Sequence, residues 1–298
     1  MTLIQKILNY EYSIMTTKPK LSVYCLTFNS EKYLPKVLKS IARLADELIV
    51  IDSGSTDNTK KIAAQFGAVW IHRDFDDYCK QRNFSIDQCK GEWILSIDDD
   101  EIMDTAMLDY LLELKTNNFA LNGKTPKGYG LRRFWYVEGK KVRSFYPTLS
   151  PDHMVRLFKK TLPDCYYDNS IVHVGQTRIY DDTIDVSTGA LHHYTCDNVK
   201  LLFSRNLKTH AARSALDMVN QVHNGARKLP KWKQLIKVYF SPIAAWRRWY
   251  WRREGYKDGR IGWYLGLYAM AYTHTQYKIA YRLLAKGRLD HIQDKTTG

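Results

Sequence analysis

Four acidic residues stand side by side at 98–101, directly behind the alternating run ILSI at 94–97. Like charges this close repel one another, and a divalent cation is one way to neutralise them. Mg²⁺ and Mn²⁺ prefer oxygen ligands and keep room in their shell for phosphate oxygens. The stretch therefore predicts a metal site. For these residues alone, a solvated acidic turn or the first turn of a helix is an equally open interpretation.

A second polar stretch, DSGSTDNT at 52–59, also follows an apolar run. A strand that ends in Asp52 and opens through this turn into a helix leaves backbone N–H groups and hydroxyls free, which suits a ribose or a phosphate. Asp57 is assigned instead as the cap of the following helix. The turn matches neither GxGxxG nor GxxxxGK[ST], so the dinucleotide fingerprint and the P-loop are both excluded.

The elements that must position these residues are read from the periodicity of apolar side chains. Strands are predicted at 21–28, 47–52, 68–74 and 92–98, and helices at 31–44, after the turn as far as Gly67, and at 78–89. Alternating strands and helices predict an α/β fold with a mostly parallel sheet and helices on both faces. Because ligands bind beyond the carboxyl ends of such strands, the acids at 98–101 should face the same crevice as 27–29 and 52–55.

Charge divides the 298-residue chain into two parts. The net charge is +14, but residues 200–298 contain 20 Lys and Arg against 5 Asp and Glu, or +15, which leaves −1 for residues 1–199. We therefore expect an amino-terminal extension at 1–20, a main domain with the predicted sheet at 21–199 and a basic helical region at 200–298. Five cysteines without a CxxC pair argue against a disulfide framework or a zinc knuckle and favour a reducing cytosol.

No segment is expected to cross a bilayer or to act as a secretory signal. Residues 1–20 contain only short apolar pieces and no small-residue cleavage site after an apolar run. The longest apolar stretch, 261–272, is well short of the ~20 residues that a spanning helix requires.

Together, the motifs resemble the inverting glycosyltransferases of family 2, which have the GT-A fold. The resemblance is carried by SVYCLTFNSEKYLPKVLKSI, DELIVIDSGSTDNT, KQRNFSI and GEWILSIDDDE, which occur in this order within residues 21–104. A thinner likeness continues through MVRLFKK, IVH, LHHYT and EGYKDGRIGW. Within the family, the chain is most similar to the lipopolysaccharide-core glucosyltransferases that add β-1,4-linked glucose to heptose.

The resemblance implies a donor, a cofactor and a set of site residues. The donor would be a UDP-sugar, UDP-glucose by likeness, held with a divalent cation, Mg²⁺ or Mn²⁺. The DxD pair that holds the metal would be Asp98 and Asp100, and His193 of LHHYT would complete the metal shell, since adjacent strand residues face opposite ways and only one of His192 and His193 can reach it. The nucleotide-sugar pocket would be formed by Thr27, Asn29, Asp52, Ser53, Lys80, Arg82, Asp98 and Asp99.

The general base of the inverting reaction is less clearly marked. Relatives in this subgroup have Val-His-Glu where this chain has Val172, His173 and Val174, so the expected glutamate is missing. The candidates are Asp168 and, second, His173, although an Asp in YYDNS is typical of a turn and a lone His in an apolar strand is typical of a core. Further candidates are Asp152, Asp181, Asp182 and Asp185.

The basic region contains Trp and Tyr interleaved with Lys and Arg over 228–260. Such segments settle at the headgroup boundary of membranes, which predicts peripheral attachment to the cytoplasmic face of the inner membrane and a glycolipid or oligosaccharide acceptor there. Nucleic acid is a rival partner for basic residues with aromatics, but no RNA- or DNA-binding fold signature accompanies them. A helical subdomain with a solvated basic face is the plain alternative.

Two rival functions remain beside a metal-dependent hexosyltransferase. One is a non-catalytic or weakened member that binds a nucleotide sugar or a membrane. The other is a nucleotidyltransferase, which also uses acidic pairs behind a parallel sheet; it usually has a glycine- and lysine-rich loop after the first strand, and TFNSEKYL is not such a loop.

Overall fold

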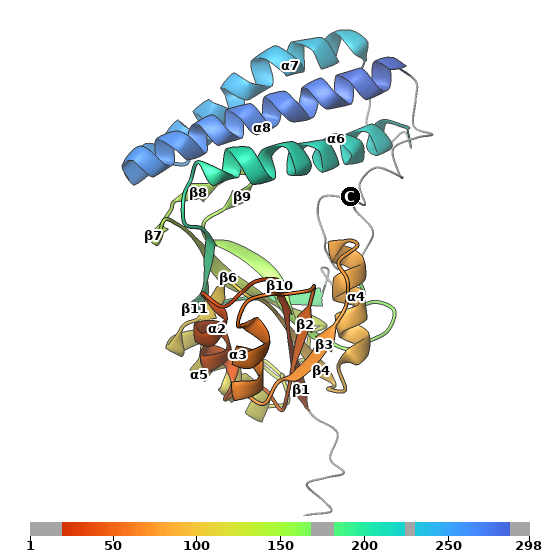
Figure 1. Cartoon of the computed structure of the whole chain (residues 1–298), viewed down its shortest axis with the longest axis vertical. Coiled ribbons are helices and arrows are strands. Elements are labelled where there is room, and N and C mark those ends of the chain that lie inside the picture. The colour runs from red at the N-terminus through yellow and green to blue at the C-terminus, as the bar shows by residue number, and fades with distance from the viewer. Residues whose placement is uncertain (1–19, 168–181, 224–229, 287–298) are drawn as a thin grey trace, which may run out of the picture.

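The computed structural model describes residues 20–167, 182–223 and 230–286. A mixed β-sheet flanked by helices forms one part of the molecule, and a layer of long helices lies across one end of it (Figure 1).

The first half of the sheet is parallel, as predicted. Its strands are β1 (Leu21–Thr27), β2 (Glu47–Asp52), β3 (Val69–His72) and β4 (Trp93–Asp98), in the spatial order β3-β2-β1-β4. The crossovers contain α2 (Leu34–Ile41), α3 (Thr59–Gln65) and α4 (Tyr78–Gln88). In α2, apolar residues at a spacing of three and four are all buried, which is the face that the sequence predicts.

Helices cover both faces of this half, so strand side chains are buried on both sides. Alternate residues of β1, such as Val23 and Cys25, join a core under α2, α3 and α5 (Thr105–Thr116), whereas Tyr24 joins the core under α4. Figure 1 shows α4 on one side of the sheet and the other three helices on the opposite side. The predicted α/β class with helices on both faces is confirmed.

The second half of the sheet is mainly antiparallel, which the sequence did not predict. β10 (Asp152–Lys159) pairs antiparallel with β4 and with β6 (Gly128–Val137), β11 (Thr183–Cys196) runs parallel to β6, and β5 (Glu101–Met103) pairs antiparallel with β11 at the edge. Short strands β7 (Lys140–Lys141), β8 (Ser144–Phe145) and β9 (Thr148–Leu149) extend from this half.

The connection from β4 to β5 explains how the site is assembled. Only Asp99 and Asp100 separate the two strands, so their ends lie within about 11 Å of each other. β5 nevertheless lies at the opposite edge of the second half from β4, so this half must curl back on itself. Because His193 in β11 is paired with Glu101, the curl brings it to the carboxyl end of β4.

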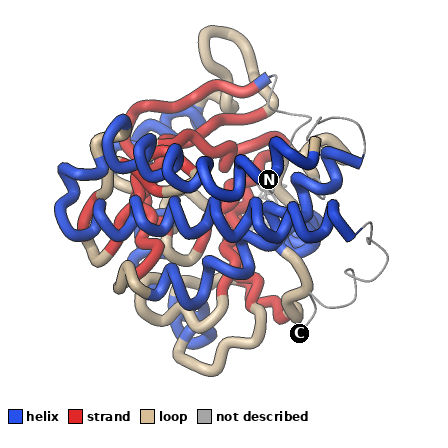
Figure 2. Tube along the Cα trace, turned by 90° about the horizontal axis from the view of Figure 1, so that it is seen from above, coloured by secondary structure: helices blue, strands red, loops and turns tan. Residues whose placement is uncertain are grey.

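The carboxyl-terminal region is helical, as predicted. It contains α6 (Leu207–His223), α7 (Lys231–Trp246) and α8 (Gly259–Lys286), together with the π-helical segments η2 (Leu202–Asn206) and η3 (Arg247–Arg252) and the 3₁₀ turn η4 (Gly255–Asp258). Seen from above, the long helices lie over the sheet (Figure 2). Within the described ranges, none of these helices combines enough length and apolar character to span a bilayer.

An apolar core joins the helical layer to the sheet. Residues of η2, α6 and α8 pack against Trp135 and Val137 of β6 and against Val142 and Phe145 that follow it; the helical contributors are Leu202, Ala211, Ile261, Leu265, Tyr268 and Tyr272. Burial of this many large apolar side chains stabilises the contact, so the helices form a fixed wall beside the strand ends.

Candidate active site

A cleft of about 1180 Å³ opens between the strand ends and the helical layer. Its floor is formed by the carboxyl ends of β1 and β4 and by β6, β10 and β11, and its far wall by η2, α6 and α8. The lining residues that bear on function are Thr27, Ser53, Tyr78, Gln81, Arg82, Asp98, Asp99, Asp100, Arg133, Trp135, Phe145, Tyr146, Arg156, Tyr167, His193, His210, Tyr268 and Tyr272. This is the crevice predicted for the acids at 98–101.

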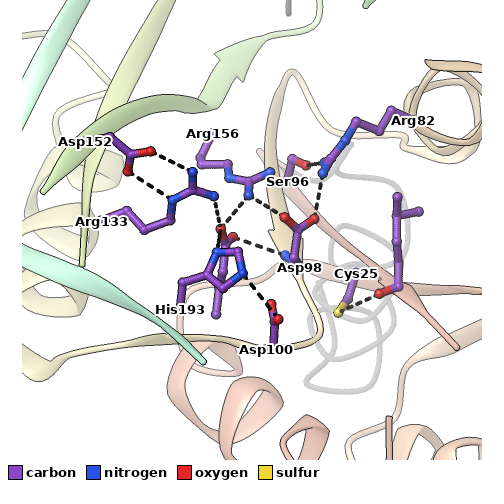
Figure 3. A network of polar contacts seen from close by, with 11 residues as sticks. Cys25, Arg82, Ser96, Asp98, Asp100, Arg133, Asp152, Arg156 and His193 are labelled. Carbon is purple, nitrogen blue, oxygen red and sulfur yellow. Dashed lines mark hydrogen bonds and ion pairs between the residues drawn. The ribbon is translucent and has the colours of Figure 1, made fainter. Parts of the chain in front are cut away.

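Asp98 lines the cleft with both carboxylate oxygens held by arginines (Figure 3). Arg82 Nη2 lies 2.6 Å from Asp98 Oδ1, and Arg156 Nη2 lies 2.5 Å from Asp98 Oδ2. Burial alone would raise the pKa of Asp98, but Arg156 and then Arg82 outweigh it and hold the pKa below its ordinary value. Asp98 is therefore a charged, fixed side chain.

The prediction that all four acids at 98–101 face the crevice is wrong for Glu101. Its side chain does not face the crevice with the aspartates but is fully buried, 2.8 Å from Arg133 Nη1 and 2.5 Å from Arg156 Nη2. Burial would raise its pKa, yet the guanidinium of Arg156, followed by His193 and Arg133, holds the pKa well below the ordinary value. Arginines of the chain thus neutralise two of the four acids, Asp98 and Glu101.

The network extends from Arg133 to Asp152, whose carboxylate accepts from Nε at 3.1 Å and from Nη2 at 2.8 Å. This bidentate geometry fixes both side chains in one orientation. Three arginines and three carboxylates therefore alternate across β4, β5, β6, β10 and α4, and Figure 3 shows Arg82, Asp98, Arg156, Arg133 and Asp152 in sequence. The arrangement is electrically neutral.

Asp100 and His193 form a pair at the edge of this network, which His193 joins through Nδ1, 3.5 Å from Glu101 Oε1. His193 Nε2 lies 3.3 Å from Asp100 Oδ2, and burial, which lowers the pKa of His193, is outweighed by Asp100 so that the pKa is raised to about 9. His192 faces the other way, where its Nδ1 lies 2.9 Å from the hydroxyl of Tyr136. Of the two histidines, His193 is the one beside the acids at 98–101, whereas His192 Nε2 lies 3.5 Å from Asp104 Oδ2. The role of His193 as a metal ligand stays a prediction.

The donor chemistry of this pair fits a divalent cation that shares its coordination shell with a substrate. Within residues 20–167, 182–223 and 230–286, no three His, Cys, Asp or Glu side chains are arranged to hold a metal ion by themselves. Asp100 and His193 supply one carboxylate and one imidazole, and phosphates and water would have to complete the shell, as is usual for Mg²⁺ and Mn²⁺. Asp98 remains a predicted ligand whose oxygens are held by two arginines in this structure.

Asp99 accepts a hydrogen bond from the hydroxyl of Ser30. Burial and the neighbouring Asp100 carboxylate raise its pKa to about 7, while the Ser30 bond lowers it. It lines the cleft, which is consistent with its predicted place in the nucleotide-sugar pocket.

Thr27 and Ser53 line the cleft, whereas Asp52 shapes the loop beneath them. The buried Asp52 carboxylate accepts from Thr27 Oγ1 at 2.9 Å, from the backbone N–H groups of Gly54 and Ser55 at 2.9 and 2.8 Å, and from Ser55 Oγ at 2.5 Å. These bonds tie the end of β1 to the turn after β2. The N-cap position of α3 is Asn58, one residue later than predicted, but Asp57 still accepts from the N–H of Thr59, the first residue of the helix.

Three predicted pocket residues, Asp52, Asn29 and Lys80, do not line the cleft. Asn29 has a φ of +53° and its Oδ1 accepts from the Thr56 N–H at 2.9 Å, so it joins two loops. Lys80 is exposed and lies 3.5 Å from Asp76 and Asp77. Residues two apart on a helix face different sides, so Lys80 points outward while Arg82 is buried.

The predicted bases, Asp168 and His173, lie outside the described residues, as does Asp181. Asp152, a further candidate for the base, is engaged by Arg133, which holds it as a charged structural partner. Asp182 and Asp185 are not among the residues that line the cleft.

Sequence reasoning missed Arg133 and Arg156, which are 4% and 2% exposed. A signal was available in the run MVRLF at 154–158, where Arg156 is a charge between apolar neighbours of a strand. A buried charge requires partners, although the sequence alone does not identify the acids that provide them.

The fold and the cleft define the class of the protein: an α/β enzyme of the GT-A type, with acidic residues at the end of the fourth strand and a helical carboxyl-terminal region. The model of the family described as glycosyl transferase family 2 matches residues 22–185, more than half of the chain. The chain belongs to this family and is a glycosyltransferase.

Several relatives show how far the likeness extends. A lipopolysaccharide core biosynthesis glycosyltransferase of Rhizobium meliloti, LpsC, is 28% identical over 287 residues, which cover 92% of this chain and 97% of LpsC. An uncharacterised glycosyltransferase of Rickettsia bellii is 37% identical over 218 residues, 67% of this chain and 73% of that protein. Among solved structures, Staphylococcus aureus TarS 1–349 aligns with a TM-score of 0.46 and 17% identity, covering 90% and 92% of the two chains.

Proposed function

We propose that the protein is a metal-dependent inverting hexosyltransferase that transfers glucose from UDP-glucose to a saccharide of a lipid-anchored glycan, such as the lipopolysaccharide or lipooligosaccharide core. It would act at the cytoplasmic face of the inner membrane as a peripheral protein. Family membership and the similarity to LpsC over nearly the whole chain support this assignment. The observation that carries it is the Asp100–His193 pair in a cleft whose other buried charges are mutually neutralised.

Charge balance explains why a cation is required. The three arginines of the network are matched by Asp98, Glu101 and Asp152, so the network offers no net positive charge to an incoming diphosphate. Mg²⁺ or Mn²⁺, held by Asp100 and His193 with Asp98 as the further predicted ligand, would supply that charge and stabilise the leaving diphosphate. The fixed arginines hold Asp98 beside this position and prevent it from turning away.

The remaining steps require groups that hold the two substrates and accept one proton. The acceptor hydroxyl attacks the anomeric carbon, the bond from this carbon to the diphosphate oxygen breaks, and the hydroxyl proton passes to a general base. Asp168 or His173 is proposed for that base. Thr27, Ser53, Arg82 and Asp99 are proposed to bind the nucleotide sugar, while Asp52 and Asn29 hold the loops that present them.

The part of the cleft where the sheet meets the helical layer is suited to a saccharide. Trp135, Phe145 and Tyr146 line it from the sheet side and Tyr268 and Tyr272 from α8, and the apolar face of a sugar ring can pack against such aromatic side chains. The indole Nε1 of Trp135 is buried and has no hydrogen-bond partner within the described part of the chain. A buried indole N–H normally has an acceptor, and a sugar hydroxyl would provide one.

The test is release of UDP from UDP-glucose, measured with Mn²⁺ and again after chelation. His193→Gln should lower kcat/KM by at least about 100-fold and weaken Mn²⁺-dependent UDP binding in calorimetry, because one protein ligand of the cation is lost. His192→Gln is the matched control, since the neighbouring imidazole faces Tyr136, and it should retain activity within about threefold. Turnover that persists in chelator, or equal effects of the two substitutions, would refute the metal site.

A further inference from the structure

One face of α7 exposes a stripe of large apolar side chains. The stripe consists of Trp232, Leu235, Ile236, Tyr239, Phe240 and Ile243, which are between 46% and 65% exposed. Their spacing of three, one, three, one and three residues places all six on a single side of the helix. Exposed apolar side chains are common singly, but a continuous helical stripe of this kind indicates a surface that binds something.

The opposite side of α7 is fixed to α8. Val238 is buried, its carbonyl lies 3.2 Å from His274 Nδ1, and Lys237 lies over the ring of Tyr277. Figure 1 shows α7 as the outermost helix, with α8 between it and the rest of the molecule. The stripe is therefore held facing outward by packing on its far side, and it does not belong to the cleft.

Cations and aromatic rings continue this surface at the end of α7. The rings of Trp246, Tyr250, Trp251 and Trp263 lie with centroids 5.1 to 6.4 Å apart. Among them, the exposed arginines of this segment are Arg247, Arg248, Arg252 and Arg253. Residues 230–253 contain no Asp or Glu, so these cations have no acidic neighbour in the segment.

We propose that the stripe of α7 and the adjoining aromatic and arginine cluster dock on the surface of a lipid bilayer that contains anionic headgroups. The inference rests on the proposed function and deepens it by identifying the membrane-binding surface. Aliphatic side chains enter the acyl boundary, Trp and Tyr rings settle at the headgroup level, and arginines contact lipid phosphates. A second copy of the chain would bring cations against cations, and a nucleic acid would leave Leu235, Ile236 and Ile243 in water.

Docking by this surface would orient the enzyme. The helical layer would face the bilayer and the sheet would face away from it, as the arrangement in Figure 1 indicates. The cleft is lined on its helical side by residues of α6 and α8, such as His210 and Tyr272. A saccharide attached to a membrane lipid would then approach along that wall, opposite the strand ends where the donor is proposed to bind.

Co-sedimentation with vesicles tests the proposal, using the full chain and vesicles of phosphatidylcholine alone or mixed with phosphatidylglycerol. The wild type should bind the mixed vesicles, and the combined variant Leu235→Ser, Tyr239→Ser, Phe240→Ser and Ile243→Ser should bind at least about tenfold more weakly. Replacing the four exposed arginines by Gln should also weaken binding to the mixed vesicles by at least about tenfold, with little change on phosphatidylcholine.

Two control variants remove apolar side chains or cations from parts of the molecule outside the proposed docking surface. Val69→Ser with Leu162→Ser removes exposed apolar side chains from the sheet side, and changing Lys36, Lys39, Lys60 and Lys61 to Gln removes four exposed cations from α2 and α3. Both controls should bind vesicles like the wild type. UDP release in solution, without vesicles, should be unchanged in every variant, which shows that each is folded and separates this test from that of the proposed function.

Three results would overturn the inference. The first is a wild type that binds neither kind of vesicle. The second is a stripe variant that binds as tightly as the wild type. The third is a wild-type dimer in sedimentation velocity that the stripe substitutions dissociate, with no vesicle binding, because this assigns the surface to a second copy of the chain.

Discussion

Charged and aromatic side chains are arranged in opposite ways at the strand ends and on α7. At the strand ends, each of the three arginines of the network is at least nine-tenths buried and within 3 Å of a carboxylate. On and after α7, exposed cations and exposed aromatic rings share a segment without a single acid. The first arrangement fixes side chains relative to one another, whereas the second leaves them available to a partner.

The difference follows from desolvation. A charge buried without a partner costs several kcal/mol, so the buried network persists only because every member is paired. An exposed cation keeps its water and needs no partner within the protein, so it adds little to stability. Substitutions should therefore affect stability at the strand ends and leave it nearly unchanged on α7, and the following experiments test this contrast in order of expected size.

The largest effect is expected from Arg156→Met. The substitution removes the guanidinium that pairs with both Asp98 and Glu101, and it leaves the buried Glu101 carboxylate with the charges of Arg133 and His193 and the backbone N–H of Asp98. Breaking a buried pair from one side typically costs about 3–5 kcal/mol. Denaturant unfolding followed by circular dichroism should show a loss of this size in the free energy of unfolding.

Arg260→Met is the control, because Arg260 pairs with Glu138 at an exposed position. Its loss should cost less than about 1 kcal/mol. If both substitutions cost the same, the buried network is not a source of stability and the contrast between the two regions fails.

Two adjacent acids provide a sharper comparison. Glu101→Gln should lower the free energy of unfolding by about 2 kcal/mol, since hydrogen bonds to two buried guanidinium groups lose their charge. Asp100→Asn, with a side chain 27% exposed and His193 as its ion-pair partner, should cost under about 1 kcal/mol while UDP release falls at least about 100-fold. Thermal unfolding and turnover measured on the same preparations would separate the two, and a reversed order would show that Asp100 is the structural acid.

Much of the first half of the sheet could be predicted, because each strand there is a local apolar run followed by a helix with its own periodicity. The order of β10, β6, β11 and β5 could not be predicted in the same way. Antiparallel pairing in this half depends on contacts between residues far apart in the chain, and no local pattern fixes which strands meet. The consequence that matters is the position of His193, which the curl of the sheet brings to Asp100.

Site residues at the ends of strands or along a strand could be predicted from the sequence. Site residues in a loop or on a helix were predicted less well, because the direction of the chain changes there. Asp98 and Asp100 follow from the end of β4. Alternation along β11 limits the choice to one of His192 and His193, and the family resemblance selects His193. Asn29 was assigned to the pocket as the continuation of β1, but its positive φ turns the chain aside. Arg156 was missed because pairing of a buried charge becomes visible only when β10 lies beside β4.

The smallest effect on stability is expected on the stripe of α7, from Phe240→Ser. Phe240 is 65% exposed, so most of its surface contacts water in the folded and unfolded chain alike, and the free energy of unfolding should change by no more than about 0.5 kcal/mol. Denaturant unfolding without lipid measures this. Ala280→Ser on α8 is a matched control at a buried position, 1% exposed, where a hydroxyl added to the packed α6–α8 contact should cost more. A loss above about 1 kcal/mol for Phe240→Ser would mean that this side chain is already covered in solution, and the stripe would then be part of the protein's own packing.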